Sequence, residues 1–126
     1  MLYFTLPLAK ASDSLHVNQR ELAENARGQL TSSLGSLNSA YANAPYFKET
    51  SGLMEALFSL AYRNLFDYLQ ATIQQLVDYL SIETTIIVSS TLPIDHGLKS
   101  QAKVVAICEA IAADGYINPI GGVSLY

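Results

Sequence analysis

The stretch that decides the fold reads IETTIIVSS at Ile82–Ser90, TLPIDHGLKSQAKVVAICEAIAADG at Thr91–Gly115 and YINPIGG at Tyr116–Gly122. A short β-branched run is followed by a loop, an apolar helical segment and a second short run. β-branched residues favour strands, and two strands joined by one helix run parallel with a right-handed crossover. The sequence therefore predicts an α/β fold, in which residues 82–122 form a strand–helix–strand crossover of a small, mostly parallel sheet.

The boundaries of these elements follow from composition and from helix-stop signals. The predicted helix of this crossover, Leu98–Ala113, is apolar on most sides, so we expect it to be broadly buried. Gly115 suits the position just after the end of that helix. The predicted strands are Leu2–Leu8, Thr84–Val88 and Tyr116–Asn118.

Upstream, residues 29–80 predict a packed helical segment. Apolar residues recur there at intervals of three and four, which places them on one face of each helix. Pro45 ends the first helix because the residue before a proline is driven out of the helical region. Asn64 is a natural cap for the third, and we expect the apolar stripes to face the core. The predicted helices are Gln29–Ala44, Glu49–Tyr62 and Asn64–Leu80.

Length and composition limit the class of protein. At 126 residues and 13.7 kDa, residues 1–126 are expected to form a single domain. Hydrophobic residues make up 50% of the chain and charged residues only 14%, against about 25% in an average soluble domain. So few charges cover the surface thinly, which favours burial of some surface in a partner or a second copy. The net charge is −4 and the seven Lys and Arg are scattered singly, so no nucleic-acid groove is predicted.

The chemistry-bearing residues are few. Cys108 is the only cysteine, and we expect it to be a small apolar residue of the core. His16 and His96 lie far apart without a carboxylate at ligand spacing, so no metal site and no cofactor are predicted. No apolar run approaches the roughly 20 residues that a membrane span needs. The N-terminus has no basic residue before its apolar run, so a cytoplasmic protein is expected.

A candidate ligand site follows from the predicted sheet. Ligands bind beyond the carboxyl ends of parallel strands, where a helix N-terminus attracts anions and Lys99 would add a full charge. We therefore expect an anion, phosphate or carboxylate. The alternative is structural, in which Ser100 only caps the helix, Lys99 is a solvated surface residue and the glycine pair only turns the chain. The candidate ligand-binding residues are Ser89, Ser90, Lys99, Ser100, Asn118, Gly121 and Gly122.

His96 is the candidate general base, although Asp95 beside it is not expected to be its catalytic partner. Adjacent loop residues seldom face each other, and Ser89 and Ser90 stand on no nucleophile-elbow motif. Residue chemistry alone therefore leaves the reaction open.

Several segments resemble the WbqC-like protein family. The segment AYANAPYF at Ala40–Phe47 resembles the Tyr-x-x-Ala-Pro-Tyr-Phe segment of that family. The other resembling segments follow in the family's order: YFTLPL at residues 3–8, DYLSI at 78–82, VSSTL at 88–92 and KSQAKVVAICEAIAADGYINPIGGVSLY at 99–126.

The resemblance implies a role in bacterial O-antigen or other surface-polysaccharide biosynthesis. It implies a transferase that moves a glycyl, other acyl or sugar-related group, with a nucleotide sugar or other anionic small molecule as partner. Carried across by position, it points to Tyr46, Ser89, Ser90, Ser100, Tyr116, Gly121 and Gly122.

The chain also departs from the family pattern. Gln101-Ala102 replaces an acidic residue and an arginine, and Asn118–Gly121 replaces Ser-Gly-Pro-Gly. The family's opening His-Gln-Pro strand and its continuation past the glycine pair are missing, so a WbqC-like domain truncated at both ends is expected. With the open edges of a truncated sheet, a homo-oligomer is expected. Two functions therefore remain open: a transferase with an anionic donor, or a non-catalytic member that acts as an oligomerising or binding module.

Overall fold

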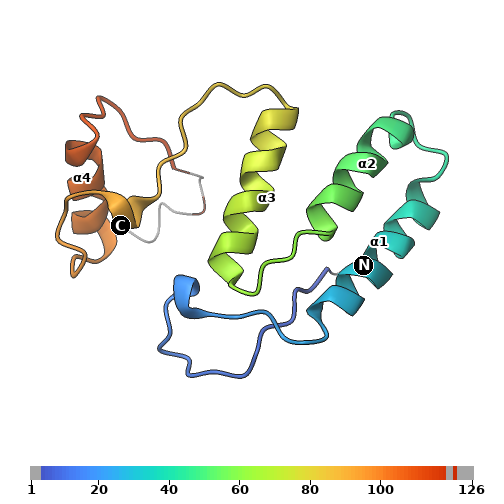
Figure 1. Cartoon of the computed structure of the whole chain (residues 1–126). Helices are drawn as coiled ribbons and strands as arrows, with labels where there is room; N and C mark the ends of the chain where they lie inside the picture. The colour runs from blue at the N-terminus through green and yellow to red at the C-terminus, as the bar shows by residue number, and fades with distance from the viewer. Residues whose placement is uncertain (1–3, 119–120, 122–126) are drawn as a thin grey trace. The chain divides into compact units, whose positions relative to one another are not determined.

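The computed structural model describes residues 4–118 and 121, and within them it is helical (Figure 1). The chain divides into two compact units, one ending at Glu83 and the other beginning at Thr84. We call them the N-terminal unit and the C-terminal unit. The elements in chain order are the 3₁₀ helix η1 (Val17–Gln19), α1 (Ala26–Tyr41), α2 (Phe47–Phe58), α3 (Leu65–Tyr79), the 3₁₀ helix η2 (Ser89–Thr91) and α4 (Ser100–Ala110).

The prediction of an α/β fold with a mostly parallel sheet is wrong. Residues 84–88, expected to be a buried strand, have no regular structure, and Thr84 to Ile87 are exposed. Their amides donate no hydrogen bond within the part of the chain that the structure describes. A β-branched run becomes a strand only where a neighbouring strand takes up its backbone groups. Residues 116–118 are likewise irregular and exposed, so α4 joins no pair of strands within the described residues.

The only β pairing among the described residues consists of isolated antiparallel bridges in the N-terminal unit. Residues 20–23 lie between residues 7–9 on one side and residues 63–65 on the other. Of the expected strand at Leu2–Leu8, residues 2 and 3 lie outside the described residues, and residues 4–8 form one bridge, Leu8 with Leu22. A second bridge joins Glu21 to Asn64. The backbone bonds are Ala9 N to Glu21 O at 2.9 Å, Ala23 N to Pro7 O at 2.9 Å, Leu22 N to Arg63 O at 2.7 Å and Leu65 N to Arg20 O at 2.9 Å.

The predicted upstream helices are confirmed, with boundaries shifted by a few residues. Helix α1 packs on α2, and α3 packs on η1; Figure 1 shows α1 and α2 side by side. Asn64 caps α3 as predicted, because its Oδ1 accepts hydrogen bonds from the amides of Phe66 at 2.9 Å and Asp67 at 3.2 Å. Its Nδ2 donates to the carbonyl of Asn18 at 2.8 Å. Asn64 therefore starts α3 and ties it to η1.

The core is small and lies in the N-terminal unit. Among the described residues the buried ones are Ala26 at 3%, Leu57 at 3% and Tyr68 at 5% exposure. The Tyr68 hydroxyl donates to the carbonyl of Leu57 at 3.3 Å, which links α3 to α2. Removal of this hydroxyl from water raises the pKa of Tyr68.

The apolar stripe of α3 does not face the core as expected. Leu69, Ile73 and Leu80 are 41%, 51% and 60% exposed. Tyr68, which lies beside that stripe on the helix surface, makes the buried contact instead. The apolar residues keep the predicted period, but the covered face of the helix is rotated toward Tyr68 and away from Leu69, Ile73 and Leu80.

In the C-terminal unit, the expectation that the fourth helix is broadly buried is also wrong. No described residue of this unit is buried, Val105 is 46% exposed, and Cys108 is only half-buried. The helix ends before Gly115, at Ala110, and Ala112 takes the left-handed position with φ 50°. The amide of Ala112 donates to Glu109 O at 3.1 Å and that of Ala113 to Cys108 O at 2.9 Å, the paired bonds of a Schellman end.

Candidate functional site

The predicted ligand-binding residues fall in three pieces of the C-terminal unit. Ser89 and Ser90 form the first two residues of η2, and Lys99 and Ser100 stand where α4 begins. Tyr116, Asn118 and Gly121 follow α4 and are exposed. Gly122 lies outside the described residues. The sheet edge that was expected to bring these pieces together does not exist within the described residues, so their convergence remains a prediction.

The η2 turn is held by its last residue. The Thr91 amide donates to the carbonyl of Val88 at 2.9 Å, and the Thr91 hydroxyl donates to the same carbonyl at 2.8 Å. A threonine that bonds the backbone three residues earlier stabilises such a turn locally. The hydroxyls of Ser89 and Ser90 are not used in it and make no hydrogen bond within the described residues. They remain available to a ligand.

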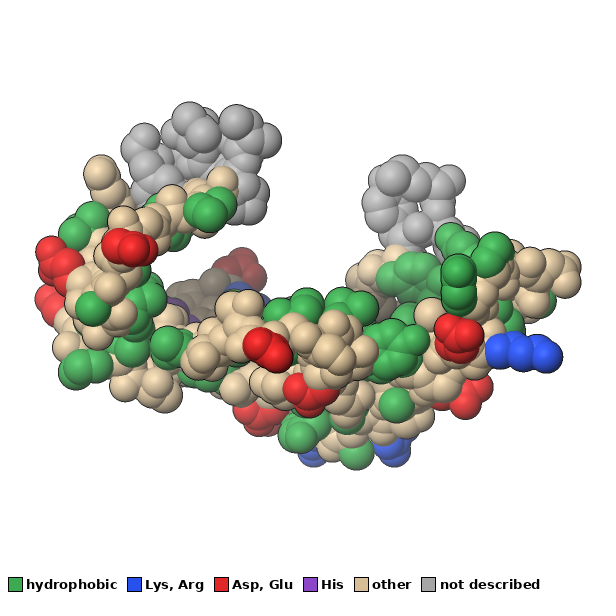
Figure 2. Space-filling view, turned by 90° about the horizontal axis from the view of Figure 1, so that it is seen from above, with side chains coloured by type: hydrophobic (Ala, Val, Ile, Leu, Met, Phe, Trp, Pro, Cys, Tyr) green, Lys and Arg blue, Asp and Glu red, His purple; other side chains and the backbone are tan. Residues whose placement is uncertain are grey.

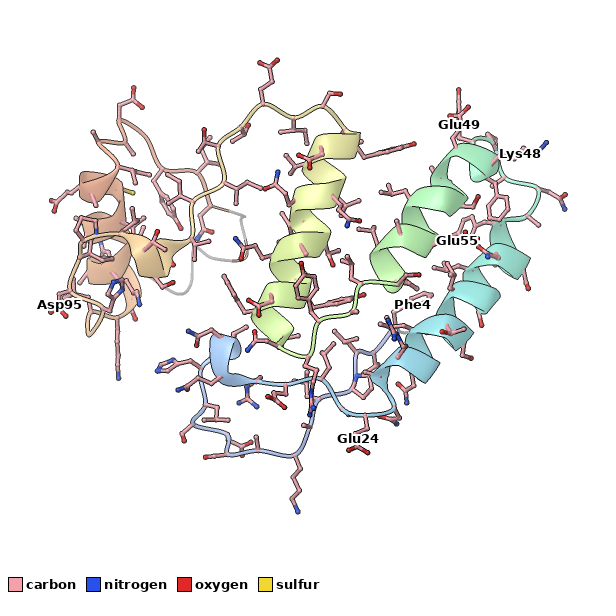
Figure 3. All side chains as sticks on the ribbon, viewed as in Figure 1. Phe4, Glu24, Lys48, Glu49, Glu55 and Asp95 are labelled. Atoms are coloured by element: carbon pink, nitrogen blue, oxygen red, sulfur yellow. The ribbon has the colours of Figure 1, made fainter. Side chains whose placement is uncertain are left out.

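Asp95 and His96 use different partners. The Asp95 carboxylate accepts the amide of Gly97 at 2.8 Å, which closes an Asx turn, and Figure 3 shows its side chain at the outer side of the loop. His96 Nε2 lies 3.1 Å from the carbonyl of Leu92. A carbonyl only accepts, so Nε2 carries the proton and Nδ1 is left as the basic nitrogen. The two side chains thus bond to different backbone groups of the loop.

Helix α4 begins without a capping side chain. Lys99 occupies the cap position with an extended backbone, and no side chain bonds the first amides of the helix. Ser100 has φ 47°, in the left-handed region, and its hydroxyl makes no hydrogen bond among the described residues, so it is not the cap that the structural alternative assumed. The start of α4 therefore combines unpaired amides with the exposed ammonium of Lys99.

A pocket of about 470 Å³ lies along α4 and the turn that follows it. Its apolar lining includes Val104, Val105 and Cys108, and two carboxylates, Glu109 and Asp114, stand among the lining residues. Of the predicted site residues only Tyr116 reaches it. No Lys, Arg or His lines the pocket, so it does not suit the predicted anion.

A second pocket lies in the N-terminal unit and was missed in the sequence. It has a volume of about 320 Å³ and contains Arg27 and Arg63. The sequence placed these arginines 36 positions apart among scattered single charges, so no local pattern could have paired them. Tyr46, which the resemblance had named, is also in this unit, at the start of α2 with φ 62° and an exposed side chain.

Other kinds of site find no support in the described residues. No group of His, Cys, Asp and Glu in residues 4–118 could hold a metal ion. None of the helices that the structure describes is long and apolar enough to cross a membrane.

Comparison with known proteins gives one match. The model of the WbqC-like protein family matches residues 1–126, which confirms the resemblance seen in the sequence. No curated protein and no solved structure matches the chain.

Proposed function

This chain belongs to the WbqC-like protein family, and from that premise we propose that it acts in bacterial surface-polysaccharide biosynthesis as a binding module that works as a pair of identical copies. The observation that carries this proposal is the uncovered apolar stripe of α3. The second copy would cover it.

The stripe has the spacing of a helix–helix seam. Its members follow one another at intervals of three and four residues, which keeps them on one face of the helix. Tyr68, on the adjoining face, is already packed within the N-terminal unit. The seam residues, half-buried or exposed, are Phe66, Leu69, Ile73, Leu76 and Leu80.

The charges of α3 are placed so that a second copy is not repelled. Asp67 and Asp78 are the charged residues of the helix, and at 100° per residue both lie on the side opposite Ile73. The positions that flank the seam include Gln70, Thr72 and Val77, which are uncharged. Like charges across an interface would oppose pairing in a chain of net charge −4. Two copies related by a twofold axis would bring seam against seam.

Light scattering coupled to size exclusion tests this proposal. We expect the full chain to have twice its 13.7 kDa mass. Ile73→Glu would place a carboxylate in the centre of the seam and is expected to yield the monomer. Gln74→Glu, about 100° round the helix on the side that carries Asp67 and Asp78, adds the same charge outside the seam and is expected to leave the dimer intact, although it gives up the bond from Gln74 Nε2 to Asp78 Oδ1 at 2.8 Å. A wild-type monomer at every concentration, or a dimer that survives Ile73→Glu, would refute the pairing.

A second candidate function is the transferase step implied by the family resemblance. It is favoured by the loop from Ser89 to Ser100, whose three serine hydroxyls are without partners among the described residues and whose Lys99 is a free-standing cation at the start of α4. A nucleotide sugar or other anionic donor would be held there by charge and hydroxyl contacts, with His96 Nδ1 as the base. Tyr116, Asn118, Gly121 and Gly122 would complete the site.

A thermal-shift screen of nucleotide sugars, phosphate and sulfate tests the donor site. A ligand at a hundred times its Kd adds about 2.7 kcal/mol to stability, a shift of several degrees. The shift should be lost in Lys99→Ala and kept in Lys48→Ala, which removes an exposed lysine of the N-terminal unit. A shift of equal size in both variants would place the ligand elsewhere and remove this candidate.

A further inference from the structure

The pocket of about 320 Å³ in the N-terminal unit has walls from three separate parts of the chain. One wall is residues 22–24, the second is the first turns of α1, and the third is residues 58–63, between the end of α2 and the start of α3. Its volume is within the range of small-molecule sites, roughly 300–1,000 Å³. The lining residues are Leu22, Ala23, Glu24, Ala26, Arg27, Leu30, Phe58, Leu60, Ala61, Tyr62 and Arg63.

These walls are fixed to one another by bonds that do not depend on a ligand. The amide of Leu22 donates to the carbonyl of Arg63 at 2.7 Å. Arg27 Nη2 donates to the carbonyl of Ser59 at 3.4 Å. Ala26, which also lines the pocket, is buried. Because these hydrogen bonds hold the walls together, the pocket is pre-formed, and ligand binding does not have to pay for ordering them.

The polar groups of the pocket are mainly cationic. A guanidinium has five N–H donors. Arg27 uses one on the carbonyl of Ser59, and Arg63, whose side chain is 81% exposed, uses one in a salt bridge with Glu21 Oε2 at 3.3 Å. The remaining donors of both are free of protein partners within the described residues. Glu24 is the one acidic lining residue, and in Figure 3 its side chain points away from α1.

The rest of the pocket is apolar. Leu30 comes from the α1 wall, and Phe58 and Leu60 come from the wall of residues 58–63. All three are half-buried, so each keeps part of its surface accessible. Hydrophobic side chains are also exposed elsewhere on the described surface, between the charged ones (Figure 2). The combination is that of a site for a molecule with an anionic head and an apolar body.

We propose that this pocket binds a small organic anion, a carboxylate or a phosphate monoester. Arg27 and Arg63 hold the anionic head from two walls, and Leu30, Phe58 and Leu60 receive the apolar body. Guanidinium groups suit both kinds of head because their paired N–H groups match two oxygens. The site is in the N-terminal unit and involves neither the α3 seam nor the Ser89–Ser100 loop. Its test is therefore independent of the tests of both proposed functions.

The test is a titration of the full-length chain followed by amide NMR, with benzoate and phenyl phosphate as probes and benzamide as the neutral control. We expect both anions to shift amides of residues 22–30 and 58–63, and benzamide to bind at least tenfold more weakly. Arg27→Gln and Arg63→Gln should each weaken binding roughly ten- to a hundredfold, the effect of one charged hydrogen bond.

The matched control is Arg20→Gln. Arg20 is in the same unit and donates to the carbonyl of Asp13 at 3.2 Å, but it does not line the pocket, so binding should be unchanged. Lys99→Ala should also have no effect, which separates this site from the loop of the C-terminal unit. Equal binding of benzamide and benzoate, or full affinity in Arg63→Gln with its fold intact, would overturn the proposal. Response to phenyl phosphate alone would restrict the ligand to phosphate monoesters.

Discussion

The two units of this chain use similar apolar sequences with opposite results. In the N-terminal unit, α1, α2 and α3 bury Ala26, Leu57 and Tyr68. In the C-terminal unit, α4 is about as apolar as α2 and α3, yet no described residue there is buried and Val105 is about half exposed. The difference is whether another element of the same unit covers the helix. Apolar periodicity predicts that a helix forms, but tertiary partners decide how much of it is buried and stabilised.

Helices α3 and α4 end in the same way, although their units differ in burial. Helix α3 ends like α4: the amide of Ser81 donates to Asp78 O at 3.1 Å and that of Ile82 to Val77 O at 3.0 Å. Ser81, with φ 53°, takes the position that Ala112 takes after α4. Both helices therefore end in a Schellman motif without the glycine usual at its left-handed position. Local end geometry is shared, whereas burial is not.

The largest expected effect comes from removing the core of the N-terminal unit. Tyr68→Ala deletes a buried ring and its bond to Leu57, and should lower the free energy of unfolding by about 3–5 kcal/mol. Urea unfolding followed by circular dichroism measures it. Tyr79→Ala is the control on the same helix, because Tyr79 is about half exposed, and it should cost less than about 1 kcal/mol. Equal losses in the two variants would show that α3 is not packed through Tyr68.

The next effect separates the two roles of Asn64. Asn64→Ala removes both the cap of α3 and the bond to Asn18, and should cost about 2 kcal/mol. Asn64→Asp keeps an acceptor for the helix amides but lacks the donor to Asn18, so it should cost about half as much. Chemical denaturation of both variants measures the difference. If Asp were as costly as Ala, the bond to η1 rather than the cap would dominate.

Alkaline pH should weaken the N-terminal unit through Tyr68. Burial raises the pKa of its hydroxyl above the ordinary value of about 10, so the folded state keeps the proton longer than the unfolded state. This contribution is complete below the unfolded pKa and is lost as pH rises through the folded pKa, with a slope of at most about 1.4 kcal/mol per pH unit. Tyr68→Phe should be less stable at neutral pH yet show a flatter loss above pH 10. Parallel curves would contradict the assignment to Tyr68.

The smallest expected effects are gains at the two helix ends. Ser81→Gly and Ala112→Gly relieve the cost of a positive φ, about 1 kcal/mol each. The gain at Ser81 should appear in the unfolding of the N-terminal unit. The gain at Ala112 should appear only as slower amide exchange within α4. A loss at either site would mean that the residue does not adopt the left-handed conformation.

The sequence predicted local structure well and tertiary structure poorly. Asn64 was identifiable as a cap because its signal is local, and the helices from residue 29 to 80 followed from their periodicity. The prediction of a strand at residues 84–88 was wrong. Ile86 and Ile87 have a high strand propensity, but a strand forms only where a neighbouring strand pairs with it. The predicted convergence of the site residues loses its basis for the same reason, because it was argued from a sheet edge, and it stays a prediction.

The sequence could not reveal the arginine pocket. Arg27 and Arg63 come together only because residues 20–23 bridge to residues 63–65, and such isolated bridges leave no repeating pattern in the chain. By contrast, adjacency in a loop was enough to argue that the side chains of Asp95 and His96 would not face each other. Contacts within a few residues are readable from sequence, and contacts across the unit are not.

Amide hydrogen exchange on the full chain tests the contrast between the two units most directly. We expect the amides of α2 and α3 to be the slowest to exchange, because they surround Leu57 and Tyr68. The amides of residues 84–88 should exchange close to the unprotected rate, because they donate no hydrogen bond among the described residues. Protection of residues 84–88 as strong as that of α3 would contradict the account, since it would mean that this segment is part of a sheet.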